Sequence, residues 1–167
     1  MHDEWFDLID RNGRVTGKAL RDVCHQHPGL IHQAVHVIVT NARGELFLQK
    51  RSPAKDIQPG KWDTSVGGHL QPGEAPEAGA RRELAEELGV TADELAPAYR
   101  YLWTSDRETE RISAFTVRHE GPFSLDPQEI SEGRFWTIPE IERDLSPEIF
   151  TEQFVSEFPR MKKVLAT

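Results

Sequence analysis

The chain has 167 residues, enough for one compact domain with its own hydrophobic core, and we expect a single domain over residues 1–167. Its net charge of −8 argues against a general nucleic-acid binder or membrane-surface binder, because such proteins present a basic face. No apolar run is long enough to span a bilayer, residues 1–4 lack a signal-peptide pattern, and the single cysteine, Cys24, excludes a disulfide framework, so we expect a cytoplasmic protein.

An extension before the main fold is predicted over residues 1–30. Two β-type runs, 5–9 and 14–19, flank Asp10-Arg11-Asn12-Gly13, and Asn-Gly between such runs is a strong hairpin signal. Residues 20–27 are predicted to follow as a short helix that Pro28-Gly29 ends. The hairpin could pair with the sheet of a second copy of the chain, so a homodimer is a possible assembly.

Two strands are predicted next, over residues 31–40 and 45–50, because apolar residues alternate along both. The following loop, 51–62, carries several cations in an otherwise acidic chain. A solvated basic loop explains these cations without any function. The functional alternative is that Arg51, Lys55 and Lys61 bind a phosphate-bearing substrate, because Arg and Lys often contact phosphates.

A helix is predicted after the turn at Pro72-Gly73. Pro76 can start it, and Gly89 can end it with a left-handed backbone. The helical period gives this segment an apolar stripe that can face a core and a neighbouring stripe of three carboxylates within about one turn. The apolar stripe is Ala80, Leu84 and Leu88, and the acidic stripe is Glu83, Glu86 and Glu87.

The acidic stripe is a candidate site for a divalent cation. Like charges at this spacing repel by about 0.2 to 0.5 kcal/mol per pair in water. A bound Mg²⁺ or Mn²⁺ turns this repulsion into a net attraction, because the carboxylates then become ligands of the ion. These ions take hard oxygen ligands and usually share one or two carboxylates with substrate phosphates. On the glutamates alone, an ordinary exposed acidic helix face is the simpler interpretation.

The remainder of the chain is predicted to add strands and two helices. Strands are expected over 95–103 and 111–118 around the charged turn 104–110, and over 132–138 after a loop. Pro139 is expected to open a short helix, and Ser146-Pro147 to cap a terminal one that Pro159 kinks or ends. The terminal helix has an apolar stripe of Ile149, Phe150, Phe154 and Phe158. This order of elements predicts an α+β layered domain.

Residues 68–90 read GHLQPGEAPEAGARRELAEELGV. They resemble the Nudix box, G-x5-E-x7-R-E-U-x-E-E-x-G-U with U apolar, at every specified position. The resemblance implies the Nudix α/β/α sandwich with a mixed sheet, here with the N-terminal hairpin added. It also implies hydrolysis of a small-molecule diphosphate linked to another moiety, with Mg²⁺ or Mn²⁺ as cofactor.

The resemblance also implies roles for individual residues of the box. Glu83 and Glu87 match the main metal ligands, Glu86 matches a ligand or the water-activating base, and the Gly68 carbonyl matches a further metal ligand. Glu74 and Arg82 match a pair that braces the loop against the helix, and Gly89 is a structural position of the motif. Because the general base varies within the family, the alternative candidates for it are Glu110, Glu129 and Glu132.

A second resemblance, from the hairpin to the end of the box, is to type I isopentenyl diphosphate isomerase. That branch binds a metal through three histidines and two glutamates, which match His25, His32, His69, Glu108 and Glu110 here. The isomerase also needs a cysteine directly before the glycine-histidine pair, and this position is Gly67. Glycine offers no acid or base, and Cys24 is expected to be a small buried residue rather than a substitute.

Three function classes remain after these comparisons of motifs. The leading one is a metal-dependent hydrolase of a nucleoside diphosphate derivative or a small organic diphosphate. The second is an isomerase of isoprenoid diphosphates, which Gly67 disfavours, and the third is a diphosphate-binding module without turnover, which the intact box disfavours. The aromatic residues offer no substrate identity: Trp103 is a candidate for stacking on a ligand, although a core role is the simpler interpretation.

Overall fold

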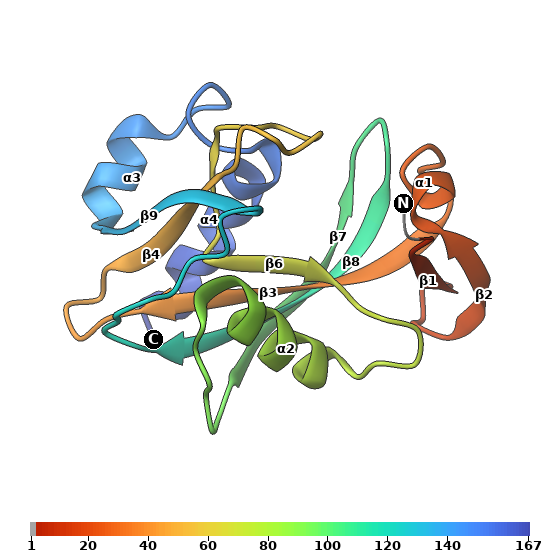
Figure 1. Cartoon of the computed structure of the whole chain (residues 1–167), viewed down its shortest axis with the longest axis horizontal. Coiled ribbons are helices and arrows are strands. Elements are labelled where there is room, and N and C mark those ends of the chain that lie inside the picture. Colours follow the sequence, from red (N-terminus) through yellow and green to blue (C-terminus); the bar gives the residue numbers. More distant parts are fainter. Residues whose placement is uncertain (1–2) are drawn as a thin grey trace.

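The computed structural model describes residues 3–167, so Met1 and His2, at the start of the segment compared with signal peptides, lie outside the described residues. Within residues 3–167 the chain forms a nine-stranded sheet and four helices (Figure 1). The elements in chain order are β1 (Trp5–Ile9), β2 (Val15–Leu20), α1 (Arg21–Cys24), β3 (Ile31–Thr40), β4 (Leu46–Arg51), β5 (Trp62–Asp63), β6 (Val66–His69), α2 (Pro76–Leu88), β7 (Ala96–Thr104), β8 (Thr109–Arg118), β9 (Ile130–Trp136), α3 (Ile138–Asp144) and α4 (Glu152–Leu165). None of these helices is both long and apolar enough to cross a membrane.

Strand β3 is the centre of the sheet. It pairs in parallel with β8 along its whole length, from Ile31 opposite Thr109 to Thr40 opposite Arg118, and antiparallel with β6. Strand β7 pairs antiparallel with β8, and β4 pairs antiparallel with both β5 and β9. The sheet is therefore mixed, as predicted.

Each face of the sheet is covered by a helix. Side chains of a strand point alternately to opposite faces, so β3 presents apolar side chains to both sides. On one face, valines of β3 pack against the apolar stripe of α2, and this core contains Val35, Val37, Val39, Ala80, Leu84 and Leu88. On the other face, Ile38 packs against α4, and this core contains Phe150, Phe154, Phe158 and Met161. Figure 1 shows α2 and α4 on opposite sides of the strands. The predicted α/β/α sandwich is confirmed.

The predicted ends of α2 are confirmed. Pro76 occupies the first turn, where its missing N–H costs no helical hydrogen bond. Gly89 adopts the left-handed conformation with φ of 67°, and its N–H donates to the Ala85 carbonyl at 3.0 Å. These two residues fix the register of the helix and thereby the direction in which its carboxylates point.

The predicted hairpin is also confirmed. Strands β1 and β2 pair antiparallel from Trp5 opposite Leu20, and Gly13 in the turn has φ of 86°. A single pairing, Ile9 with Ile31, joins the hairpin to β3. Figure 1 shows β1, β2 and α1 together at one end of the molecule, with β2 as the outer strand.

Three predicted helix boundaries are wrong, and the strand predicted over 132–138 is instead Ile130–Trp136. The helix over 20–27 shortens to Arg21–Cys24, after which the backbone turns and directs His25 toward β3. The terminal helix starts after Thr151, whose hydroxyl accepts the Phe154 N–H at 3.1 Å, and not at Ser146-Pro147. Pro159 lies inside this helix and does not end it, because the buried apolar face continues beyond it.

Strands β5 and β6 were not anticipated within the segment before α2. Strand β6 contains Gly67 and Gly68, and glycine has a low strand propensity. Pairing with β3 overrides that propensity, since Ala34 to Val37 align with Val66 to His69 in an antiparallel ladder. This pairing places the start of the Gly68–Val90 motif at the centre of the sheet.

Candidate active site

An open cavity of about 600 Å³ lies where β6, α2, the β7–β8 turn and the start of α4 converge. Its lining includes three carboxylates of α2, Glu83, Glu86 and Glu87. It also includes two histidines of a cluster described below, His25 and His69. Both groups of predicted metal ligands therefore open into one cavity.

The three carboxylates of α2 differ in burial. Glu87 is 5% exposed and accepts a hydrogen bond from Gln49 Nε2 at 2.7 Å. The side chain of Glu86 is 57% exposed, whereas that of Glu83 is 13% exposed. Burial raises the pKa of Glu83, and it raises the pKa of Glu87 well above the usual range. A bound cation would provide the compensation that two buried neighbouring carboxylates need.

Gly68 allows the α2 carboxylates to approach β6. A Cβ at this position would lie 2.2 Å from Cδ of Glu83, which is far inside van der Waals contact. Only glycine leaves the Glu83 carboxylate beside the backbone of β6. The first glycine of the motif is thus explained by the space that Glu83 occupies.

Arg82 ties the loop before α2 to the helix. Its Nε and Nη2 each donate to the Glu74 carboxylate at 2.9 Å, and Nη2 also donates to the His69 carbonyl at 3.0 Å. Nη1 donates to Glu83 Oε1 at 2.7 Å. These charge-assisted bonds lower the pKa of Glu74 and hold Glu83 in place. The geometry is that of the brace predicted from the motif.

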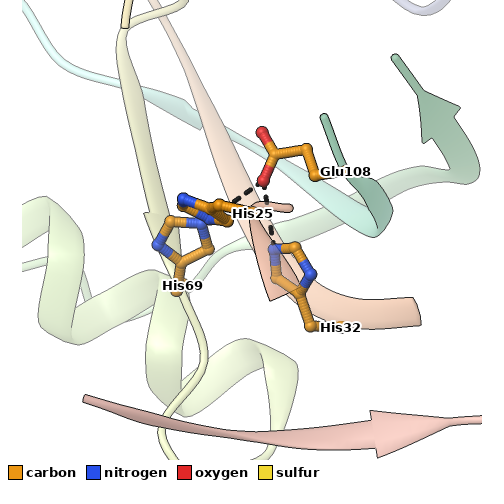
Figure 2. Close-up of side chains that lie close together, drawn as sticks. All are labelled: His25, His32, His69 and Glu108. Atoms are coloured by element: carbon orange, nitrogen blue, oxygen red, sulfur yellow. Dashed lines mark ion pairs between the residues drawn. The ribbon is translucent and has the colours of Figure 1, made fainter. Parts of the chain in front are cut away.

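The histidine cluster contains His25 from the end of α1, His32 from β3, His69 from β6 and Glu108 from the β7–β8 turn (Figure 2). One possible ligand atom from each of these residues lies within 4.8 Å of all the others. Glu108 Oε2 lies 2.9 Å from His25 Nε2 and 3.5 Å from His32 Nε2. Residues from four separate segments therefore point toward a common centre.

Glu110 adjoins this cluster. Its Oε1 lies 3.1 Å from His69 Nε2 and 3.4 Å from His32 Nε2, and its Oε2 accepts a hydrogen bond from Gln153 at 3.1 Å. All five residues that match the isomerase metal site are thus brought together. The resemblance did not indicate Gln153, or Phe6, whose ring stacks on His32 with centroids 4.9 Å apart.

The charges of the cluster are strongly perturbed. Burial lowers the pKa of His32, but hydrogen bonds to Glu108 and Glu110 outweigh it and raise the pKa to about 9. Burial raises the pKa of Glu108, but contacts with His25 and His32 outweigh it and lower the pKa to about 2. Several of the buried atoms nevertheless lack a well-formed hydrogen bond within residues 3–167, namely His25 Nε2, His32 Nε2 and Glu108 Oε2. Nitrogen and oxygen atoms that converge in this way without well-formed hydrogen bonds are suitable ligands for a divalent metal.

The predicted substrate-binding cations divide into two groups. Arg51 and Lys55 line the cavity, and they pair there with Asp63 at 3.5 Å and Glu129 at 2.5 Å, respectively. Lys61 is not part of the lining, because its ammonium group donates to the Pro147 carbonyl instead. The structure therefore does not bring Lys61 into the cavity, and its role at the substrate stays a prediction.

The remaining candidate residues, two alternative bases and three tryptophans, divide into those that line the cavity and those that do not. Glu129 lines the cavity, whereas Glu132 is exposed on β9 and is not part of the lining. Trp103 lines the cavity and is half-buried, so it is available to a ligand. Trp62 and Trp136 are core residues with 9% and 4% exposure.

The family model described as "NUDIX domain" matches residues 30–156, which is most of the chain. The chain belongs to the Nudix family. An uncharacterized Nudix hydrolase of Yersinia pestis is 34% identical over 139 residues, covering 82% of this chain and 74% of the relative. An isopentenyl-diphosphate Delta-isomerase of Streptomyces avermitilis is 35% identical over 157 residues, covering 90% and 80% of the two chains.

Two solved structures have the same fold. DR0079 from Deinococcus radiodurans matches with a TM-score of 0.81 and 27% identity, covering 94% of this chain and 98% of that one. A MutT protein from Methanosarcina mazei matches with a TM-score of 0.65 and 25% identity, covering 80% and 96%. With the complete box present, this Nudix protein is an enzyme of the pyrophosphohydrolase type.

Proposed function

We propose that this Nudix enzyme is a divalent-metal-dependent hydrolase that cleaves the diphosphate of a nucleoside diphosphate derivative or a small organic diphosphate. The observation that supports this most directly is the packing of Glu83 beside Gly68, with the buried Glu87 one turn further along α2, where burial raises the pKa of both carboxyl groups. Glu83, Glu86, Glu87 and the Gly68 carbonyl would hold Mg²⁺ or Mn²⁺. The bound metal would neutralise phosphate oxygens and favour attack by water.

Glu86 is the best placed of the candidate bases. It is the most exposed carboxylate of the α2 group and lines the cavity, so it can reach a water molecule. Glu110 is a weaker candidate, because hydrogen bonds from His32 and His69 outweigh the effect of burial and keep its pKa well below the usual range. We therefore assign Glu110 to the histidine cluster and keep Glu129 as the alternative base.

Two parts of the lining support binding of the diphosphate. Arg51 and Lys55 would exchange their present partners, Asp63 and Glu129, for phosphate oxygens. His25, His32, His69, Glu108 and Glu110 would hold a second divalent metal in the same cavity. Two metal sites in one cavity suit a substrate with several anionic oxygens.

Isomerisation of an isoprenoid diphosphate is the competing activity, since the histidine cluster and the similarity to isomerases both favour it. Gly67 opposes it, because the position that would need a thiol carries no side chain. Binding without turnover is opposed by the complete set of α2 carboxylates.

We further propose a single domain in the cytoplasm, with the open edge of β2 as the surface for a homodimer.

One assay separates these activities. The purified protein is incubated with a panel of nucleoside diphosphate derivatives and isoprenoid diphosphates and Mg²⁺ or Mn²⁺, and cleavage to phosphate or monophosphate products, isomerised product and binding are scored. We expect cleavage that EDTA abolishes. Isomerised product or binding alone would contradict the proposal.

Matched variants connect the activity to the site. The double variant Glu83→Gln/Glu87→Gln is expected to lose at least about 100-fold in kcat, because the metal would lose two charged ligands. Glu77→Gln lies on the same helix, but outside the cavity lining, and is expected to keep full activity. Equal activities of the two variants would contradict the assignment.

A further inference from the structure

A buried polar cluster lies beneath the cavity, apart from both groups of metal ligands. Glu157 of α4 is completely buried, and its carboxylate has three partners from two strands. It accepts hydrogen bonds from Tyr99 at 2.6 Å and Tyr101 at 2.8 Å, and it lies 2.7 Å from Nδ1 of His36. Such a network fixes the rotamer of every member.

Glu157 determines the protonation of His36. A carboxylate only accepts hydrogen bonds, so Nδ1 of His36 must carry the proton that it donates. Burial lowers the pKa of His36, but the charge of Glu157 outweighs it, and with smaller contributions from Asp63 and Glu110 the pKa rises to about 9. At neutral pH the ring is therefore a cation, and Nε2 is a second N–H donor.

Nε2 of His36 is directed to the cavity. His36 lines the cavity, and within residues 3–167 Nε2 has no hydrogen-bond partner and is not among the fully buried polar atoms. Gly67 is its direct neighbour on β6. A Cβ on Gly67 would lie 3.3 Å from Cδ2 and 3.5 Å from Nε2 of His36, so glycine leaves this edge of the imidazole uncovered.

Three of the cations around the cavity already have carboxylate partners, whereas His36 keeps one free donor. The cations Arg51, Lys55 and Arg82 all meet carboxylates with their charged ends inside the cavity region. His36 meets its carboxylate on the side away from the cavity and keeps Nε2–H free. Gly67 and Gly68 are consecutive on β6 and face opposite sides of the strand, Gly67 toward His36 and Gly68 toward Glu83, and all four residues line the same cavity.

We propose that His36 binds a phosphoryl oxygen of the diphosphate substrate through Nε2–H, and that Gly67 is glycine in order to keep this donor accessible. The inference rests on the proposed function, because it assigns part of the same substrate. Gly67 occupies the position where the isomerase has its cysteine. In this inference that position serves phosphate binding, because it leaves His36 accessible. Glu157, Tyr99 and Tyr101 are then positioning residues that hold the imidazolium.

The first test is independent of turnover. Methylenediphosphonate, which cannot be hydrolysed, is titrated with Mg²⁺ into the full chain, and the histidine side-chain nitrogens are followed by NMR. We expect the Nε2 shift of His36 to move and its pKa to rise further, because a bound anion stabilises the imidazolium. His27, which is exposed and outside the cavity lining, serves as the internal control.

The second test uses two variants with different structural risk. His36→Gln removes the charge, and Gly67→Ala covers the imidazole edge while keeping every side chain of the Glu157 network. Both are expected to weaken methylenediphosphonate binding about tenfold or more, as the loss of a hydrogen bond to a charged group implies. Gly17→Ala, whose Cβ would enter open space, is the matched control and should bind normally.

The outcomes separate this inference from the proposed function. Binding of methylenediphosphonate with unchanged His36 signals, or with unchanged affinity in Gly67→Ala, would overturn the role of His36 and leave hydrolysis untouched. Failure of the unmodified protein to hydrolyse any diphosphate, with the expected His36 response intact, would contradict the proposed function alone. Absence of any binding would contradict both.

Discussion

Nη2 of Arg82 lies 3.0 Å from the carbonyl oxygen of His69, whose imidazole Nε2 lies 3.1 Å from Glu110. The arginine of α2 is therefore bonded to the backbone of a residue whose side chain belongs to the histidine cluster. Through Glu74 and Glu83, the same guanidinium also contacts the loop before α2 and the α2 carboxylates. A displacement at Arg82 would therefore reach both proposed metal sites.

Arg82→Lys is expected to destabilise the protein and reduce its activity. Lysine keeps the charge but cannot reproduce the two parallel bonds to Glu74 or reach His69 at the same time. Losing one charge-assisted bond costs about 1.5 to 3 kcal/mol of unfolding free energy, measured by urea denaturation. Arg143→Lys, in an exposed ion pair with Asp144, should leave the unfolding free energy nearly unchanged. Equal losses in the two variants would show that Arg82 is not a brace.

Gly68→Ala is expected to impair metal binding more than folding. The new methyl group would coincide with the Glu83 carboxylate, which must then leave the backbone of β6. Displacing a ligand of this kind costs about 10- to 100-fold in metal affinity or activity. Mn²⁺ affinity measured by electron paramagnetic resonance is the readout, with Gly17→Ala as control because no atom lies near its Cβ. Unchanged Mn²⁺ affinity would remove Gly68 and Glu83 from the site.

Local patterns were sufficient for the elements that position the α2 carboxylates. Pro76 and Gly89 act through their own backbone restrictions, so the ends of α2 could be read without knowledge of the rest of the fold. Thr151 was missed as a helix cap because Ser146-Pro147 carries the same local signal five residues earlier. Which of two local signals starts a helix is decided by tertiary packing.

The cluster around Glu157 could not be predicted from the sequence. His36 and Glu157 are separated by 121 positions, and nothing in either neighbourhood indicates a buried ion pair. Glu157 lies on a helix whose apolar stripe explains the folding of α4 without it. The histidine cluster was found only because a resemblance to a known metal site indicated it, since His25, His32 and His69 have no regular spacing.

His25→Gln is expected to lose metal from the histidine cluster. The Nε2 atom of His25 lies 2.9 Å from Glu108 Oε2 without a well-formed hydrogen bond, and both atoms belong to the group of possible metal ligands. Metal bound after incubation with Mn²⁺ or Zn²⁺ and gel filtration is measured by mass spectrometry, and about one equivalent should be lost. His27→Gln changes an exposed residue two positions away and should retain the metal. Equal metal content in the two variants would exclude His25 as a ligand.

The pair of His36 and Glu157 is expected to make stability fall between about pH 6.5 and pH 9 in metal-free protein. The pKa of His36 rises from 6.5 to about 9 in the folded chain, so the folded state binds a proton that the unfolded state releases in this range. The stabilisation is complete below the unfolded pKa and is lost as the pH rises through the folded pKa. A shift of this size corresponds to about 3 kcal/mol at most.

Glu157→Gln isolates this contribution. Glutamine retains a partner for the tyrosines but carries no charge, so the pKa of His36 would no longer be raised by its largest favourable interaction. Unfolding free energies from urea titrations at pH 6 and pH 9.5, in EDTA, are compared between the two proteins. Other groups that titrate in this range, including His32, contribute to both and cancel in the difference. The unmodified protein should lose about 2 to 3 kcal/mol more than the variant, and parallel losses would show that Glu157 does not hold His36 in its charged form.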